Sequence, residues 1–229
     1  MKKSLLVLIA IFTITTSYSQ TEKGKKIIGV QFNLSGYNNS NLDSLYKYDR
    51  NYLGFQIVPS FGYFIKDNFA IGVNLNFEIT NANEKNTHTD YTPTETTIKT
   101  NSISYGGGGF ARYYKKIADK FFFYANGEVD YTYQARESDY TTDNPNYVYP
   151  PSNPAHQEVQ YNIISVNINP GLVYFATPKL GIHTAFGEIY YTNSTSKNIS
   201  LHYDNHYNYS NYGINLNMST FYLGINYYF

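Results

Sequence analysis

The chain ends on the stretch Thr220 to Phe229, which reads Thr-Phe-Tyr-Leu-Gly-Ile-Asn-Tyr-Tyr-Phe. Every second residue is apolar or aromatic, and in an extended strand these residues share one face. They are Phe221, Leu223, Ile225, Tyr227 and Phe229. Gly224 and Asn226 lie between them, so the opposite face is smaller and more polar. The stretch predicts a C-terminal β-strand with one apolar face.

Seven earlier segments show the same alternation. They span residues 26–36, 52–63, 69–79, 101–114, 121–134, 159–174 and 180–191. An apolar residue at every second position predicts a strand with two different faces. The third segment is the most regular, because Phe69, Ile71, Val73, Leu75, Phe77 and Ile79 alternate with small or polar residues.

Three features modify these strands. Pro59 cannot donate to a ladder, so it predicts a bulge or a weakened pair in the second strand. The run Gly106 to Gly109 removes side chains from both faces of the fourth strand, which permits curvature or close approach. The apolar phase changes near Ser219, which predicts a bulge before the terminal strand.

The connections between the strands alternate in length. The long ones are 37–50, 81–100, 135–157 and 192–212, and the short ones are 65–68, 115–120 and 175–179. Outer-membrane barrels have short periplasmic turns, long extracellular loops and an even number of strands. The sequence therefore predicts an all-β fold, an eight-stranded antiparallel up-and-down transmembrane β-barrel with short periplasmic turns and long extracellular loops.

A soluble barrel is the structural alternative, and it would turn the apolar faces inward. Nearly every predicted strand has a full apolar face, more than the interior of an eight-stranded barrel can hold. The composition favours the membrane as well, since the mean hydropathy is −0.44 although 18% of the residues are aromatic, with 27 Tyr and 15 Phe. Such a mixture is expected where one face of each strand meets lipid and the other a polar lumen.

The N-terminus predicts export. Lys2 and Lys3 precede an apolar run that ends at Phe12, and small residues follow at Ser17 and Ser19. This pattern is typical of a secretory signal peptide, residues 1–19, followed by one barrel domain, residues 20–229. No segment has the roughly 20 apolar residues of a transmembrane helix. The chain has no Cys, and its 17 basic and 17 acidic residues give no attraction to nucleic acid.

The sequence resembles the small bacterial outer-membrane β-barrel domain proteins of the OmpA/OmpX/OmpW-like superfamily. Three stretches carry the resemblance: the terminal alternation that ends at Phe229, the segment Pro59 to Phe64, and Ala111 to Tyr114. The resemblance implies residence in the outer membrane and a terminal strand that the barrel-assembly machinery reads, with Phe229 as its end residue. The sequence from Ser17 to Gln20 and the richness in Asn and Tyr resemble a member of the Bacteroidetes.

The inward faces carry the first candidate site. Five ionisable residues fall on the predicted lumen side, and they are Glu78, Arg112, Glu128, Asp130 and His183, with Glu188 as a further candidate. Because side chains fill the interior of an eight-stranded barrel, we expect them to form a polar network in which Arg112 pairs with carboxylates.

Other groups are weaker candidates. His183 with Ser165 could act as base and nucleophile of a lipid-modifying enzyme, but no Gly-x-Ser-x-Gly motif accompanies them. His202 to His206 lies in a loop without the geometry of a metal site. The long loops are rich in Tyr and Asn, a composition that can bind a glycan or a protein.

We therefore expect no catalytic residue, no cofactor and no metal. The predicted function is that of an integral outer-membrane β-barrel protein without enzymatic activity, with a structural or surface-display role. Transport of small hydrophobic compounds through a lateral opening beside Pro59 or the glycine run is the alternative, and lipid modification is a second one. The expected partners are outer-membrane lipid, the barrel-assembly machinery and an extracellular glycan or protein, with no nucleic acid.

Overall fold

The computed structural model describes residues 20–43, 46–88, 94–144, 155–200, 206–215 and 221–229, and the side chain of Phe221 is outside this description. The described residues form β-strands and contain no helix, so they include none that is long and apolar enough to cross a membrane. The predicted signal peptide lies outside the described residues. The chain is therefore all-β, as expected.

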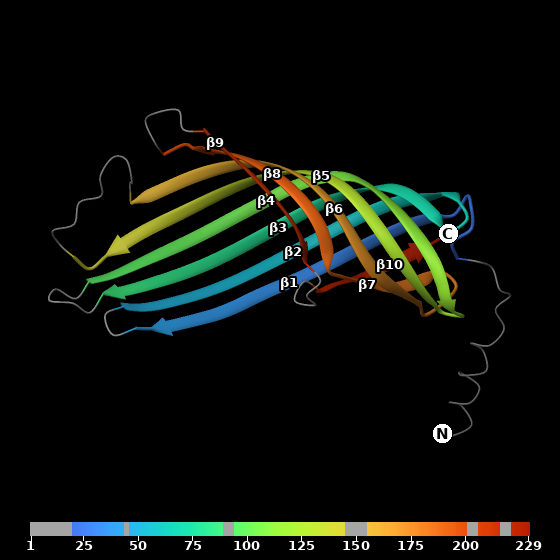
Figure 1. Ribbon diagram of the computed structural model, residues 1–229, viewed down its shortest axis with the longest axis horizontal. Coiled ribbons are helices and arrows are strands. Elements are labelled where there is room, and N and C mark those ends of the chain that lie inside the picture. The colour runs from blue at the N-terminus through green and yellow to red at the C-terminus, as the bar shows by residue number, and fades with distance from the viewer. Residues whose placement is uncertain (1–19, 44–45, 89–93, 145–154, 201–205, 216–220) are drawn as a thin grey trace, which may run out of the picture.

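The strands lie side by side in one sheet, and the longer ones run along the length of the molecule (Figure 1). Their bounds are β1 Lys26–Leu42, β2 Tyr46–Lys66, β3 Phe69–His88, β4 Thr94–Ala118, β5 Phe121–Thr142, β6 His156–Phe175, β7 Leu180–Phe186, β8 Glu188–Asn198, β9 His206–Asn215 and β10 Phe221–Tyr228.

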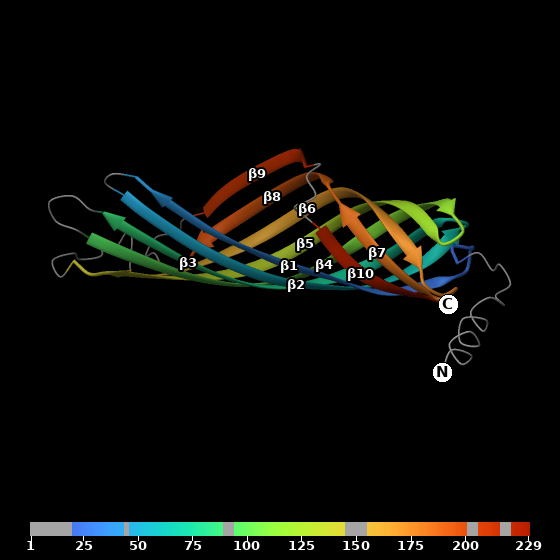
Figure 2. The same cartoon turned by 90° about the horizontal axis from the view of Figure 1, so that it is seen from below.

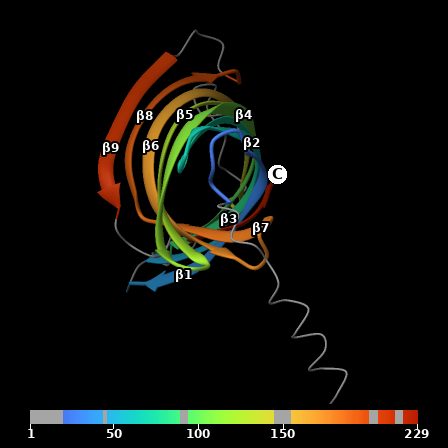
Figure 3. The ribbon, with the colours of Figure 1, turned by 90° about the vertical axis from the view of Figure 1, so that its right-hand side faces the viewer.

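Eight of the strands close into a ring. Sequential neighbours from β1 to β7 pair antiparallel, and β10 pairs with both β7 and β1. The closing ladder between β1 and β10 runs from Ile27↔Tyr228 to Phe32↔Leu223. Figure 3 shows the ring from the end at which the C-terminus lies. The predicted antiparallel up-and-down arrangement of eight ring strands is confirmed.

The last two predicted strands differ from the expectation, because each consists of two pieces. β8 follows β7 after Gly187, whose φ is 69°, and it pairs with β6. β9 pairs with β8, whereas β10 pairs with β7. Figure 2 shows β8 and β9 standing away from β1. The bulge predicted near Ser219 falls outside the described residues, but β9 and β10 do differ in phase, since Ile214 and Leu223 are both exposed.

The predicted long loops are also largely wrong, because much of their sequence is strand. β1 extends to Leu42 and β2 begins at Tyr46, and β4 alone has 25 residues. A strand needs only about 9–11 residues to cross a bilayer. Beyond the apolar stretch both faces carry Asn, Thr and Ser, so the alternation disappears while the backbone ladder continues, as in Asn38↔Asn51 and Asn86↔Thr96.

The apolar faces of the ring point outward. On β3, Val73 and Leu75 are 59% and 53% exposed, whereas Asn74 between them is 5% exposed. The same alternation holds on β10, where Ile225 is exposed and Asn226 is buried. The interior is therefore the polar side of the sheet, as the membrane interpretation predicted.

The predicted short turns all lie at the end of the ring that also holds both ends of the barrel domain (Figure 1). Asp67 and Asn68 join β2 to β3, and Asn68 has a left-handed φ of 62°, which Asn tolerates better than most residues. The backbone N–H of Asn68 donates to the carbonyl of Thr21 over 2.6 Å. The residues before β1 thus fold against this end of the barrel.

Pro59 and the glycine run behave differently. The ladder between β2 and β3 stops after Ile57↔Phe77 and resumes at Ser60↔Asn74, so Pro59 does weaken the pairing. The glycines from Gly106 to Gly109 pair without interruption on both sides. A Cβ on Gly108 would collide with the backbone oxygen of Val129 and with the carboxylate of Asp130. The glycine run therefore permits close approach.

We predict that Gly108→Ala lowers the free energy of unfolding by about 1–3 kcal/mol, because β5 must move to make room for the methyl group. Gly109→Ala is the matched control, since its Cβ would point outward and meet only a backbone oxygen 3.7 Å away. Urea titration of the refolded variants in lipid vesicles, followed by circular dichroism, measures both. Equal losses for the two variants would contradict the close-approach interpretation.

Candidate functional site

An aromatic layer closes the lumen at the short-turn end of the ring. Its largest members are the rings of Phe64, Tyr114, Phe122, Tyr124, Phe175 and Tyr228. The centroids of Phe175 and Tyr228 are 4.9 Å apart, and those of Phe64 and Tyr114 are 5.5 Å apart. We call these six residues the aromatic floor. Because its members are almost fully buried, the lumen is closed at this end.

Sequence reasoning missed the aromatic floor, although a signal exists. Each of these rings lies on the inward phase of its strand within a few residues of a short turn or of the C-terminus. An aromatic residue on the otherwise polar face, placed beside a short turn, would have identified it. The outward faces of the same strands also carry Phe and Tyr, so the inward rings do not differ from them in composition.

Arg112 lies directly on the aromatic floor. Its guanidinium is over the ring of Tyr124 at 4.7 Å and over that of Phe110 at 5.2 Å. Its Nε donates to Oδ1 of Asn126 over 3.0 Å, and Nδ2 of Asn126 donates to Oε1 of Glu128 over 2.5 Å. Arg112 and Glu128 are thus linked through an amide, and the described ion pairs include none between Arg112 and a carboxylate.

A cavity of about 190 Å³ lies above the aromatic floor. Its walls come from seven ring strands and from β8, and they are mostly amides, hydroxyls and carboxylates. The lining residues are Gln31, Gln56, Val58, Asn74, Asn76, Tyr124, Asn126, Glu128, Asp130, Thr132, Ser165, Asn167, Asn169, Ala185, Glu188 and Tyr222. We call this space the acidic cavity, because Glu128, Asp130 and Glu188 are its ionisable carboxylates.

The five predicted lumen residues occupy three levels. Glu128 and Asp130 line the acidic cavity, and Arg112 lies below it. Glu78 pairs with Gln56 and Ser104 and is not among the lining residues. His183 is 2% exposed beside the aromatic floor, with its Nδ1 3.4 Å from the hydroxyl of Tyr124. The structure brings Arg112, Glu128 and Asp130 together, and His183 contacts Tyr124, the ring over which Arg112 lies, whereas Glu78 is outside the cavity lining.

The two catalytic candidates are not neighbours. Ser165 pairs with Asp130 and Thr192, whereas His183 pairs with Val173. Eight residues along β6 separate Ser165 from Val173, which corresponds to roughly 26 Å. A base and a nucleophile must be within hydrogen-bond reach, so this pair does not form a catalytic site.

The predicted metal candidate is outside the structural description, since residues 201–205 are not described. Among the residues that are described, no three His, Cys, Asp or Glu side chains are placed to hold a metal ion.

The predicted assembly strand lies at the seam of the ring. Leu223, Ile225, Tyr227 and Phe229 are exposed on its outer face. The backbone of Lys26 donates to the carbonyl of Phe229 over 2.7 Å, and Phe229 donates back over 3.0 Å. The two ends of the barrel domain therefore pair with each other. A role of this strand in assembly stays a prediction.

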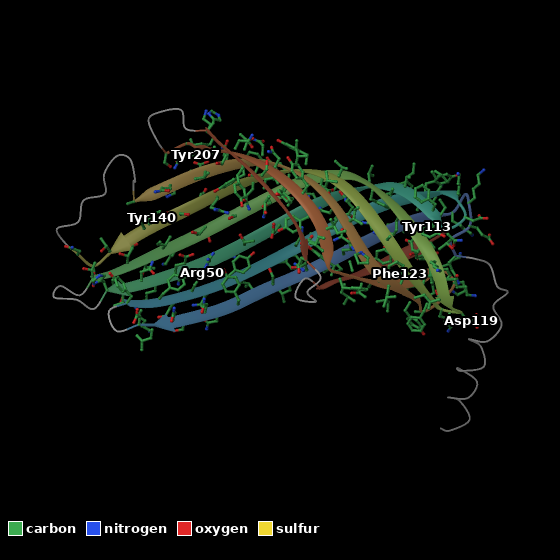
Figure 4. The ribbon with its side chains drawn as sticks, in the orientation of Figure 1. Arg50, Tyr113, Asp119, Phe123, Tyr140 and Tyr207 are labelled. Atoms are coloured by element: carbon green, nitrogen blue, oxygen red, sulfur yellow. The ribbon has the colours of Figure 1, made fainter. Side chains whose placement is uncertain are left out.

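The end of the molecule remote from the short turns is polar on its outer surface. Arg50, Tyr140 and Tyr207 lie toward this end and Tyr113, Phe123 and Asp119 toward the other (Figure 4). Ion pairs cross neighbouring strands here, between Arg50 and Glu84 at 2.9 Å and between Asp139 and His156 at 2.7 Å. The tyrosines of β9 are strongly exposed, and Tyr212 is 79% exposed.

No protein-family model matches the sequence, and it matches none of the curated proteins. Among solved structures, the outer membrane protein OprG from Pseudomonas aeruginosa is 13% identical, with 92% of this chain and 98% of that chain covered and a TM-score of 0.43. A major outer membrane protein from Thermus thermophilus is 10% identical, with 91% and 100% covered and a TM-score of 0.41. The N-terminal β-barrel domain of Pseudomonas aeruginosa OprF is 13% identical, with 91% and 98% covered and a TM-score of 0.34. Because these TM-scores are low, the assignment of the fold rests on the strand pairing described above.

We predict that Arg112→Ala lowers the free energy of unfolding by about 3–5 kcal/mol, because it leaves the buried Oδ1 of Asn126 without a donor and opens a space above the aromatic floor. Arg136→Ala is the control, since Arg136 likewise lies over a ring, that of Tyr161, and donates to its hydroxyl over 3.1 Å, but is only partly buried. We expect the control to cost about 1 kcal/mol. Urea titration in lipid vesicles measures the free energy of unfolding of both variants. Similar losses would show that Arg112 stabilises the protein no more than the partly buried Arg136 does.

Asp139 and His156 form a hydrogen-bonded pair outside the apolar band. This pair predicts that part of the stability of the folded protein depends on pH. The hydrogen bond and charge of Asp139 raise the pKa of His156 above its usual value of 6.5. A raised pKa means that the stabilisation is complete below pH 6.5 and is lost as the pH rises through the folded-state pKa. We expect the NMR titration midpoint of His156 to fall in Asp139→Asn and to stay unchanged in Asp119→Asn, at the opposite end. A midpoint that does not respond to Asp139→Asn would show that the pair does not form in solution.

Proposed function

We propose that the chain is an integral outer-membrane β-barrel protein without enzymatic activity, with a structural or surface-display role. The observation that carries the proposal is the closed ring of eight strands with an apolar outer face and a polar lumen. Closure pairs the edges of the ring strands over most of the apolar outer face, as a sheet that resides in a bilayer requires.

The dimensions of the outer face support this proposal. The alternating apolar residues of β3 extend from Ile71 to Ile79, which corresponds to roughly 27 Å along the strand. Exposed tyrosines occur at both margins, with Tyr63 and Tyr113 near the short turns and Tyr105 and Tyr131 on the other side. Such an apolar band between two aromatic girdles matches the hydrocarbon core and its interfaces.

The orientation follows from the same features. The short turns and both ends of the barrel domain would face the periplasm, and the long polar extensions of β1 to β5 would project outside the cell. The exposed tyrosines of β9 and the Tyr-rich loops would then meet an extracellular glycan or protein. During biogenesis the terminal strand would be the part that the barrel-assembly machinery engages.

The lumen supports a role without catalysis. The aromatic floor closes it, and its Ser165 and His183 lie far apart on β6 and its neighbour. Lipid modification therefore lacks a paired nucleophile and base in the described residues.

Transport of small hydrophobic compounds remains the alternative, and one observation favours it. The described ladder between β1 and β10 ends at Phe32↔Leu223, and β9 pairs with β8 and stands away from β1 (Figure 2). This seam, rather than Pro59 or the glycine run, would be the lateral opening. The polar lining of the acidic cavity argues for the non-transport role.

The proposal predicts that the protein fractionates with the outer membrane and resists extraction by alkaline carbonate. In detergent it should migrate differently on gels before and after boiling, because a closed barrel withstands the detergent until it is heated. Carbonate extraction of the folded protein would contradict membrane insertion.

Deletion of the last three residues tests whether the ladder between β1 and β10 is needed to close the ring. Removing Tyr227 to Phe229 takes away the pairs Ile27↔Tyr228 and Ile28↔Tyr227, and we expect the heat-dependent shift to be lost. A truncated chain that still migrates as a folded barrel would show that the β1–β10 ladder is dispensable.

A further inference from the structure

The acidic cavity holds negative charge that the described residues do not balance. Glu128, Asp130 and Glu188 line it, and none of its lining residues is Lys, Arg or His. Arg112 lies beneath it and its charge acts on Glu128 through the intervening Asn126, but no described cation acts on Asp130 or Glu188. Buried carboxylates are costly unless they are paired, so the cavity favours a positively charged occupant.

Unused hydrogen-bond acceptors point to the same kind of occupant. Asn74 is 5% exposed and lines the cavity, and its Oδ1 has no hydrogen-bond partner among the described residues. The buried Oδ1 of Asp130 likewise has none. A buried acceptor without a donor costs free energy, and a ligand with N–H groups would satisfy it. The side chain of Asn74 hydrogen-bonds to the carboxylate of Asp130, yet these two acceptor oxygens remain without a donor among the described residues.

The carboxylates are spread over the wall. Glu128 and Asp130 are on β5, while Glu188 is on β8, on the far side of β6. No three acidic or imidazole groups of the described residues converge as metal ligands do. Two positive charges joined by a flexible chain fit this spacing better than one compact ion.

The size of the cavity and its access agree with a short linear molecule. A cavity of about 150 Å³ can hold benzene, which has six heavy atoms, so a volume of about 190 Å³ is enough for a chain of that size. The aromatic floor closes the lower side. Gln31 and Tyr222 line the cavity, and they lie on β1 and β10 next to the point at which these strands part. A ligand can therefore enter from the seam beside β9 or from the open end of the lumen.

We propose that the acidic cavity binds a small organic dication, a linear diamine whose ammonium groups pair with Glu128 and Asp130 at one end and with Glu188 at the other. Oδ1 of Asn74 accepts one of the ammonium N–H groups. This binding site lies in the lumen. It therefore does not depend on what the outer surface of the barrel contacts.

The test uses the folded full-length mature protein in detergent micelles at about pH 7.5, where carboxylates are ionised and amines protonated, and isothermal titration calorimetry with 1,4-diaminobutane. We expect saturable binding at one site. The neutral isostere 1,4-butanediol should give no saturable heat, because it has the same length but no charge. Magnesium chloride at equal charge concentration should not displace the diamine, because the cavity lacks a convergent metal site among the described residues.

The variant E128Q/D130N removes two charges and keeps the shapes of the side chains. We expect diamine binding to weaken at least about tenfold, the factor that corresponds to losing one hydrogen bond to a charged group. E137Q is the matched control, since Glu137 is exposed on the same strand and does not line the cavity, and it should bind as the unmodified protein does. Heat-dependent gel migration verifies that each variant is folded. If the double variant does not fold, E188Q takes its place with the same expectation.

The proposal is overturned if the unmodified protein gives no saturable heat with the diamine, or if the folded cavity variant binds it as tightly as E137Q. Equal binding of the diol, or displacement of the diamine by magnesium, would also overturn it, because the site would then select for shape alone or for charge alone.

Discussion

The short ladder between β1 and β10 is the interaction on which the rest of the structure depends. A sheet with an apolar outer face cannot leave its edges open in hydrocarbon, because each unpaired N–H or carbonyl there costs several kcal/mol. Six residue pairs, from Ile27↔Tyr228 to Phe32↔Leu223, remove the two edges over the part of the wall that is nearest the turns. The main-chain bonds between Lys26 and Phe229 complete the closure at the very end of the chain.

Closure also fixes what the interior can contain. Once the apolar faces point outward, the alternate residues are confined to a narrow lumen, and its two ends have different chemistry. The aromatic floor packs tightly at the turn end, with Arg112 held against it by Asn126 and the ring of Tyr124. Above it the glycines at 106 and 108 let β5 approach β4, and Asp130 lies over Gly108. The result is a space that is lined by three carboxylates and by no basic residue.

The wall is less regular on the side of the last two predicted strands. Gly187 separates β7 from β8, and the side chains change phase across it, since Ile182 and Ile189 both point outward. β10 remains in the ring while β9 follows β8 away from β1. The described ladder between β1 and β10 ends at Phe32↔Leu223, whereas the outward apolar residues of β1 continue to Leu34, so the described closing ladder is shorter than the apolar band.

The sequence by itself determined the class of fold, the first six strands of the ring and the face that each of them turns outward. A period of two with a full apolar face, repeated along the chain, has few other solutions, and the lipid-facing barrel proposed above would account for outward rings such as Phe61 and Tyr113. It did not predict the polar extensions of β1 to β5, because Asn and Thr on both faces hide the alternation while cross-strand pairing continues to hold the backbone. Nor could it show that Arg112 contacts Asn126 and not a carboxylate, that Ser165 and His183 are far apart, or that β9 leaves the ring. Those features depend on register and on which strands become neighbours, and only the tertiary structure decides them, because side chains far apart in the chain meet solely through the pairing of their strands.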